Sequence, residues 1–174
     1  MRLRNIPGAD AAITESVYCI KSPETHKGHW QEVFPSQQPL HIEIGMGKGR
    51  FMMDLAAAHP DINYLGIERY SSVLLRALQK MEENPLPNLF FICMDAADVA
   101  EVFDHGEVDR IYFFNPFSLE LLKRVVGRIL DSYYANLREM QLFFYYPTDE
   151  YISYMMTVDE LMFVDEIDCK DLFL

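Results

Sequence analysis

From residue 40 onward the sequence alternates short apolar runs with longer stretches in which apolar residues recur every three or four positions. This alternation is typical of βαβ units, in which helices cover both faces of a parallel sheet. The predicted strands cover residues 40–45, 62–68, 89–94, 108–114, 141–146 and 161–167, and the predicted helices cover 49–59, 71–83, 98–103 and 118–135, the last with Ser118 as its N-cap. The pattern therefore predicts an α/β fold of the Rossmann-like class with a mostly parallel, doubly wound sheet.

The length of 174 residues fits one domain, in which residues 1–39 are predicted to form an irregular lead-in. No apolar targeting segment or membrane-length run is present, which favours a cytoplasmic protein with no membrane partner. Three distant cysteines and five scattered histidines predict no metal site. The net charge of −12 argues against tight, nonspecific binding to nucleic acid. A basic N-terminal arm containing Arg2, Arg4, Lys21 and Lys27 is still compatible with this charge.

The first predicted strand runs directly into a glycine-rich turn and then a helix. The segment 43–49 contains Glu43, followed by Gly45, Gly47 and Gly49. Glycine permits positive φ angles and lets a ligand approach the main chain closely, and ligands of open α/β folds bind at the carboxyl edge of the sheet. The turn is therefore a candidate cofactor site, although such turns also serve as plain connections between a strand and a helix.

Two further carboxylates follow the next predicted strands. Glu68 ends the second strand, where its carboxylate could accept hydrogen bonds from the ribose hydroxyls of a nucleoside cofactor. Asp95 and Ala96 follow the third strand, where the carboxylate could accept a hydrogen bond from an adenine amine. Each acid alone could instead be a solvated strand end or a helix cap. Their recurrence at one sheet edge favours a binding site.

The charge and spacing of the turn indicate which cofactor it suits. The glycines have the spacing G-x-G-x-G behind an acid, unlike the G-x-G-x-x-G pattern that seats a pyrophosphate. Glu43 would repel a pyrophosphate but suits a ligand that carries an ammonium and a sulfonium. The predicted cofactor is S-adenosyl-L-methionine, and the predicted class is a methyltransferase.

The sequence resembles the bacterial tRNA (guanine-N7-)-methyltransferases over residues 1–112. The segments that carry this resemblance are 1–5, 27–30, 41–49, 62–68, 77–80, 94–96 and 106–112. The resemblance implies a Rossmann-like fold, binding of S-adenosyl-L-methionine by Glu43, Glu68 and Asp95, and tRNA as the partner. Guanine-N7 methylation of tRNA is accordingly the expected function.

After residue 112 the sequence departs from that family. The family continues with a segment like N-F-S-D-P-W-P-K, whose Asp serves catalysis, whereas this chain has Asn115, Pro116 and Phe117 there. Residues 113–174 resemble another small methyltransferase and end before the family's last strand. The sequence does not decide whether the chain is a natural, a recombinant or a designed hybrid. Asn115 is the candidate catalytic residue, because an Asn-Pro-aromatic segment can hold a planar amine beside the methyl group, but the segment could also be a simple turn.

Two alternatives to the tRNA function follow from this departure. One is a methyltransferase for an amine of a small molecule or protein, which would use Asn115, Pro116 and Phe117. The other is a domain that binds the cofactor but catalyses nothing. The sequence does not decide between them, nor does it predict the oligomeric state.

The second half also contains apolar residues whose roles are predicted from their pattern. Residues 143–146 are expected to form a buried central strand rather than a platform for stacking RNA bases. Met155, Met156 and Met162 are expected to lie in the core. Lys123, Arg124 and Arg128 are expected to lie on a solvated helix face rather than to form a nucleic-acid site, and His41 is expected to be packed within its strand.

Overall fold

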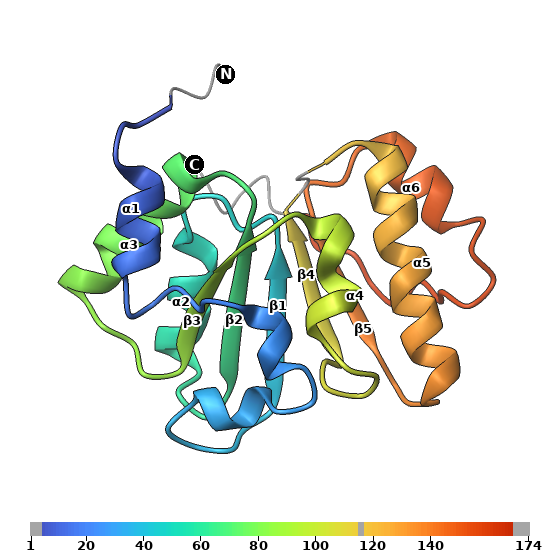
Figure 1. Cartoon of the computed structure of the whole chain (residues 1–174). Coiled ribbons are helices and arrows are strands. Elements are labelled where there is room, and N and C mark those ends of the chain that lie inside the picture. The colour runs from blue at the N-terminus through green and yellow to red at the C-terminus, as the bar shows by residue number, and fades with distance from the viewer. Residues whose placement is uncertain (1–4, 115–116, 169–174) are drawn as a thin grey trace.

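The computed structural model describes residues 5–114 and 117–168, and its centre is a parallel sheet (Figure 1). The strands are β1 (Leu40–Ile44), β2 (Asn63–Glu68), β3 (Leu89–Cys93), β4 (Arg110–Phe114) and β5 (Gln141–Tyr145). They lie in the order β3-β2-β1-β4-β5, and each neighbouring pair is parallel. The strand order reverses at β1, which lies between β2 and β4. The predicted Rossmann-like α/β fold is confirmed, and β1 marks the position where ligands bind in such sheets.

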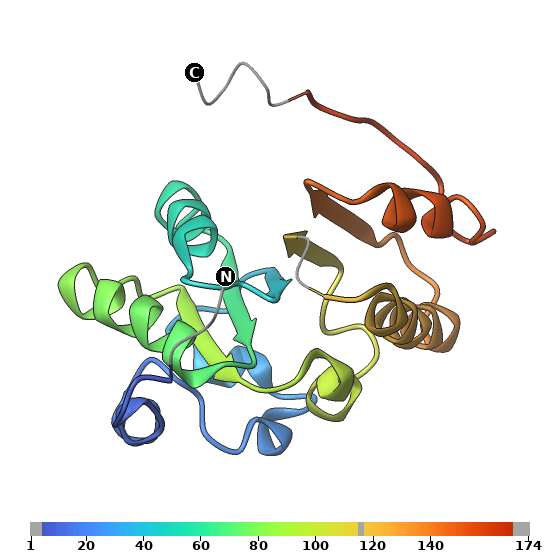
Figure 2. The ribbon, with the colours of Figure 1, turned by 90° about the horizontal axis from the view of Figure 1, so that it is seen from above.

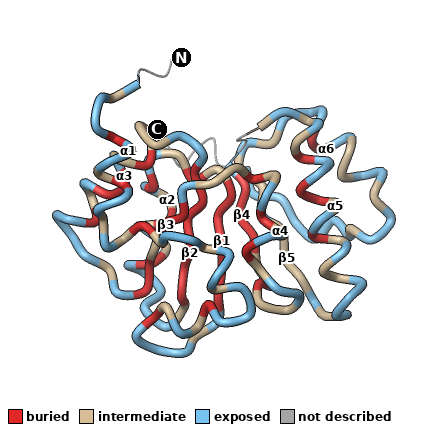
Figure 3. The backbone as a smooth tube through the Cα atoms, in the orientation of Figure 1, coloured by how far each residue is buried: buried red, intermediate tan, exposed pale blue. Residues whose placement is uncertain are grey.

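Helices cover both faces of this sheet, as the view from above shows (Figure 2). One face carries α2 (Arg50–Ala58) and α3 (Ser71–Glu83), while the other carries η3 (Ala96–Asp98), α4 (Val99–Val102) and α5 (Leu119–Ala135). Successive side chains of a strand point to opposite faces of the sheet. Ile42 of β1 packs on the face that carries α5, in a cluster with Val125. Tyr64 of β2 packs on the face that carries α3, in a cluster with Leu74. Burial is concentrated on these strands (Figure 3).

The helix boundaries agree closely with the sequence pattern. The observed α3 covers the predicted range, and α5 begins where its predicted cap places it. The Ser118 side chain accepts a hydrogen bond from the Leu121 amide at 3.3 Å, which satisfies one of the unpaired amides at the start of the helix. The predicted packing of His41 is also confirmed, because its ring is 8% exposed and lies edge-on to Tyr64.

The N-terminal region is more ordered than predicted. It forms α1 (Ala9–Glu15), η1 (Pro23–His26) and η2 (Trp30–Val33), so the prediction of an irregular lead-in over residues 1–39 is wrong for these segments. Trp30 is 1% exposed, and its Nε1 donates to the Val102 carbonyl at 2.6 Å. Cys19 forms an isolated parallel β-bridge with Phe91 of β3. The region is ordered by docking against distant elements, which a local sequence pattern does not reveal.

The C-terminal region differs from prediction in four respects. Residues 161–168 have no regular structure, so the predicted strand at 161–167 is wrong. Met162 is 83% and Met156 is 69% exposed, so neither lies in the core, while Met155 is partly buried. A strand forms by pairing with another strand, and residues 161–168 do not join the sheet.

The third difference concerns the end of the sheet. The strand β5 pairs only with β4 among the described strands and is therefore an edge strand, not a buried central one, and Phe143 is 37% exposed. It is followed by α6 (Asp149–Met155), which the sequence pattern did not predict. The Thr148 side chain caps this helix by accepting from the Tyr151 amide. The single buried side chain of α6, Tyr151, packs against α5, which explains why its periodicity is weak.

None of the helices in the described part of the chain is long and apolar enough to cross a membrane. Residues 5–114 and 117–168 also hold no group of three or more His, Cys, Asp or Glu side chains that could bind a metal ion.

Candidate cofactor site

The glycine turn connects β1 to α2 at the carboxyl edge of the sheet. Gly45, Gly47 and Gly49 have φ angles of 77°, 61° and 76°, all in the left-handed region that other residues rarely adopt. The amides of Gly45 and Met46 both donate to the Ile67 carbonyl, at 2.9 and 3.0 Å. These bonds anchor the turn to the end of β2, so the two strand ends that carry the predicted acids are held together.

Gly47 and Gly49 differ in what surrounds them. A Cβ on Gly49 would lie 2.8 Å from the Cβ of Ala77, because α2 begins against α3 at this point. A Cβ on Gly47 would meet nothing within 4 Å, so open space lies beside this part of the turn. Gly49 therefore serves the close packing of two helices, whereas Gly47 leaves room for a ligand at the main chain.

Glu68 joins the glycine turn to the start of α3. Its Oε2 accepts a hydrogen bond from the Gly47 amide at 2.9 Å, and its Oε1 accepts one from the Tyr70 amide at 3.0 Å. The side chain is 7% exposed. The structure thus brings Glu68 to the turn, and because a carboxylate has about four acceptor positions, it can accept further bonds from a ligand.

Glu43 is a buried acid with an unsatisfied oxygen. The residue is 1% exposed, and its Oε2 has no hydrogen-bond partner within the described part of the chain. Burial, and secondly the charge of Glu68, raise the pKa of Glu43 from its ordinary 4.5 to about 9. A buried carboxyl group without a partner is costly, and it is suited to a cationic group that brings a compensating charge.

Asp95 lies at the same sheet edge but has partners of its own. Its Oδ1 accepts from the Ala97 amide at 2.9 Å, so it caps η3, as the alternative interpretation of the sequence allowed. Its Oδ2 lies 3.5 Å from Nη1 of Arg69, a partly exposed ion pair. Ala96 is buried beside it at 8% exposure. Sequence reasoning missed Arg69, although its position directly after Glu68 could have indicated it.

The segment after β4 is described only in part. Asn115 and Pro116 lie outside the described residues. Phe117 is partly buried, packs edge-on against Phe113 with ring centroids 6.1 Å apart, and its amide donates to the Tyr151 hydroxyl at 3.2 Å. The ring of Phe117 therefore belongs to the packing between the sheet, α5 and α6.

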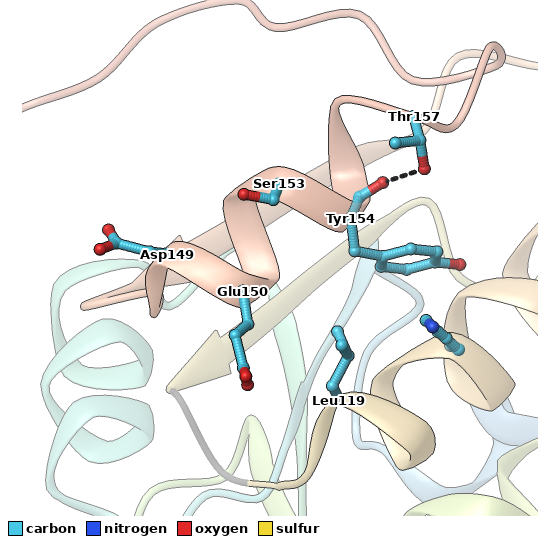
Figure 4. A pocket seen from close by; sticks show the side chains of 7 residues that line it. Leu119, Asp149, Glu150, Ser153, Tyr154 and Thr157 are labelled. Carbon is cyan, nitrogen blue, oxygen red and sulfur yellow. Dashed lines mark hydrogen bonds between the residues drawn. The ribbon is translucent and has the colours of Figure 1, made fainter.

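A shallow hollow of about 480 Å³ lies between α5 and α6 (Figure 4). Its lining includes Leu119, Glu150 and Tyr154, and none of the predicted site residues. Lys123 lies 5.6 Å from the centre of the Tyr154 ring, and Arg128 forms an exposed ion pair with Asp131. These surface contacts agree with the predicted solvated face of α5.

The protein has a Rossmann-like fold, and at the carboxyl edge of its sheet a glycine turn follows Glu43, bonds to Glu68 and shares the edge with Asp95. The chain belongs to the family described as "Putative methyltransferase", whose model matches residues 37–147. This match continues beyond Tyr112, where the resemblance noted in the sequence ends.

Curated relatives carry the name expected from that resemblance. The chain is 54% identical over 112 residues to a tRNA (guanine-N(7)-)-methyltransferase of Lachnoclostridium phytofermentans, covering 64% of this chain and 52% of the relative. It is 51% identical over 113 residues to the protein of that name from a Geobacillus species, covering 64% and 51%. The predicted resemblance is confirmed over this segment, and the chain spans about half the length of the curated relatives it matches.

Two solved structures with limited similarity to the chain are named as methyltransferases. The aminoglycoside resistance methyltransferase NpmB1 matches with a TM-score of 0.45 and 26% identity, over 52% of this chain and 48% of that one. The 16S rRNA (adenine(1408)-N(1))-methyltransferase of Catenulisporales acidiphilia matches with a TM-score of 0.47 and 20% identity, over 65% and 51%.

Proposed function

We propose that this chain binds S-adenosyl-L-methionine and transfers its methyl group to N7 of a guanine in tRNA, in the cytoplasm. The observation that carries the proposal is the 54% identity to a tRNA (guanine-N(7)-)-methyltransferase over 112 residues. The glycine turn, Glu43 and Glu68 support the cofactor independently, from geometry and charge.

The proposed cofactor fits the site on two structural grounds. Open space beside Gly47 lets a ligand reach the main chain of the turn. The buried, unpartnered oxygen of Glu43 suits the positive charges of the ligand. In this proposal Glu43 and the turn at Gly45, Gly47 and Gly49 hold the methionine portion, Glu68 accepts from the ribose hydroxyls, and Asp95 with Ala96 binds the adenine.

S-Adenosyl-L-methionine supplies a methyl group that its sulfonium already activates. Guanine N7 has a lone pair and no proton, so the protein needs no general base at this position. The residues contribute chiefly by holding the acceptor in line with the methyl group, which converts a bimolecular encounter into an aligned one. Asn115 is proposed to position the acceptor through its side-chain carbonyl.

Calorimetry with S-adenosyl-L-methionine tests the cofactor site first. We expect binding to the unmodified chain and a loss of at least tenfold in affinity for Glu68→Ala. The matched control is Glu83→Ala, because Glu83 is an exposed residue at the end of α3. The absence of binding at millimolar cofactor would refute the cofactor assignment.

Transfer of a labelled methyl group tests the acceptor. The substrate is tRNA from a strain that lacks its own guanine-N7 enzyme, and we expect label in 7-methylguanosine after digestion. Asn115→Ala should lower turnover with little change in cofactor affinity. A chain that binds the cofactor but labels only an amine acceptor, or nothing, would refute the tRNA assignment and support one of the two alternatives from the sequence.

A further inference from the structure

Three aromatic rings gather where β4 and β5 end. We name Phe114, Tyr145 and Tyr146 the aromatic platform. Phe114 and Tyr145 are nearly parallel, with centroids 6.1 Å apart and an interplanar angle of 20°, while Tyr146 meets Phe114 edge-on at 5.7 Å. Phe114 is 45% and Tyr146 is 53% exposed. Two large rings are thus held in a fixed arrangement with much of their surface open to solvent.

The aromatic platform lies beside the glycine turn. The strand β4 pairs with β1 up to Ile44 and Phe113, and the next residues of the two segments are Gly45 and Phe114. Phe51, in the first turn of α2, has its ring centroid 4.5 Å from that of Tyr145. An element that begins at the glycine turn therefore contacts the platform directly.

The platform and Glu43 also share one face of the sheet. Glu43 pairs in register with Tyr112, whose ring contacts Phe51 at 5.5 Å and Tyr145 at 6.4 Å. Residues 112 and 114 of β4 point to the same side, because strand side chains alternate. A ligand above the platform would therefore be adjacent to a cofactor held at Glu43.

Tyr146 adopts an unusual backbone conformation. Its φ angle is +49°, which is uncommon for a residue other than glycine, asparagine or aspartate. Such outliers persist only where the surrounding structure holds them, and they concentrate at functional sites. Here the conformation accompanies a ring placed at the sheet edge against Phe114, rather than one buried in the core.

The sequence analysis placed another ring, that of Phe117, in the segment that could hold a planar acceptor. This ring packs against Phe113, and both the amide and the carbonyl of Phe117 bond to the Tyr151 hydroxyl, so it is engaged in the packing of α6. Phe114 and Tyr146, by contrast, are exposed rings at the ends of β4 and β5. The predicted buried central strand at residues 143–146 is wrong, because β5 lies at the edge of the described sheet. The end of β5 is therefore open to a ligand.

We propose that the aromatic platform stacks on the planar purine base that accepts the methyl group, with Phe114 and Tyr146 as its two contact rings. This inference rests on the proposed function and specifies how the acceptor is held. Stacking recognises the flat face of the base and tolerates different sequences around it. It therefore fits a chain whose net charge of −12 does not favour extended phosphate contacts.

Nuclear magnetic resonance titration with guanosine tests the platform without requiring catalysis. We expect the aromatic resonances of Phe114 and Tyr146 to move upfield, because a stacked purine shields protons above its face, and ribose alone should leave them unchanged. Tyr146→Phe should bind guanosine as the unmodified chain does. Tyr146→Gly should weaken binding by about tenfold, the loss expected for one stacking ring.

Tyr146→Gly also separates binding from folding. Glycine accepts a φ of +49° without strain, so this variant should remain folded. Tyr134→Ala is the matched control, since this ring is 61% exposed on α5 and should not affect guanosine. The proposal is overturned if guanosine leaves the platform resonances unmoved, or if Tyr146→Gly binds guanosine as well as the unmodified chain.

The outcome can be separated from that of the proposed function. Cofactor binding and tRNA methylation without guanosine contacts at Phe114 and Tyr146 would overturn the platform and leave the methyltransferase assignment standing. Guanosine contacts that Tyr146→Gly removes, in a chain that does not bind S-adenosyl-L-methionine, would support the platform and refute the cofactor assignment.

Discussion

Replacing Glu43 by glutamine should stabilise the protein without ligand, by an amount that grows with pH. The folded protein raises the pKa of Glu43 from 4.5 to about 9, so between these values the folded state holds a proton that the unfolded chain has released. Its stability therefore falls as pH rises through this window, by about 1.4 kcal/mol per pH unit. At pH 7, which is two and a half units above the ordinary pKa of 4.5, the raised pKa of Glu43 lowers the free energy of unfolding by about 3 kcal/mol.

Glutamine has nearly the same shape and does not ionise, so Glu43→Gln should remove this cost. We expect the free energies of unfolding of the two proteins to be similar near pH 4.5 and to differ by about 3 kcal/mol at pH 7. Urea denaturation at pH 5, 6, 7 and 8 measures the difference. The control is Glu83→Gln, an exposed substitution expected to change the free energy by less than about 0.5 kcal/mol. Parallel pH profiles for the unmodified chain and Glu43→Gln would refute the reasoning.

Three further predictions concern packing, and urea denaturation measures each. Gly49→Ala should lower the free energy of unfolding by about 3 kcal/mol and Gly47→Ala by about 1 kcal/mol. Both glycines adopt left-handed φ, but only a Cβ at Gly49 would lie 2.8 Å from the Cβ of Ala77. Equal losses for the two variants would contradict the packing role of Gly49. Trp30→Phe should lower the free energy of unfolding by about 2 kcal/mol, because it leaves the buried Val102 carbonyl without its donor and opens a cavity. An unchanged urea midpoint would show that this hydrogen bond contributes little. Met162→Ser should change stability by less than about 0.5 kcal/mol, because the side chain is 83% exposed; a large loss would mean that Met162 is packed after all.

The central fold was predictable because its signals are local. Each short apolar run up to residue 145 became a strand, and the amphipathic stretches between them became α2, α3 and α5. The carboxyl ends of parallel strands meet at one edge, so Glu43, Glu68 and Asp95 could be expected together from their positions at strand ends. Glycines in a turn after β1 likewise indicated positive φ angles, which all three adopt.

The elements that sequence reasoning missed depend on distant partners. The helix α1 packs on α3, and α6 buries only Tyr151 against α5, so neither carries a strong periodic pattern. Residues 161–167 have the apolar composition of a strand but do not join the sheet. Hydrogen bonding between strands is a tertiary property, and composition alone does not supply it.

The same division applies to the site. The sequence by itself determined which residue types lie at the carboxyl edge: a glycine turn and three acids, a pattern that follows from chain order and strand direction. Only the tertiary structure decided their surroundings. It bonds Glu68 to the amides of Gly47 and Tyr70, pairs Asp95 with Arg69, and buries Glu43 with an unsatisfied oxygen. It also exposes Phe114 and Tyr146 beside the turn, because the burial of a side chain depends on which elements cover its face of the sheet.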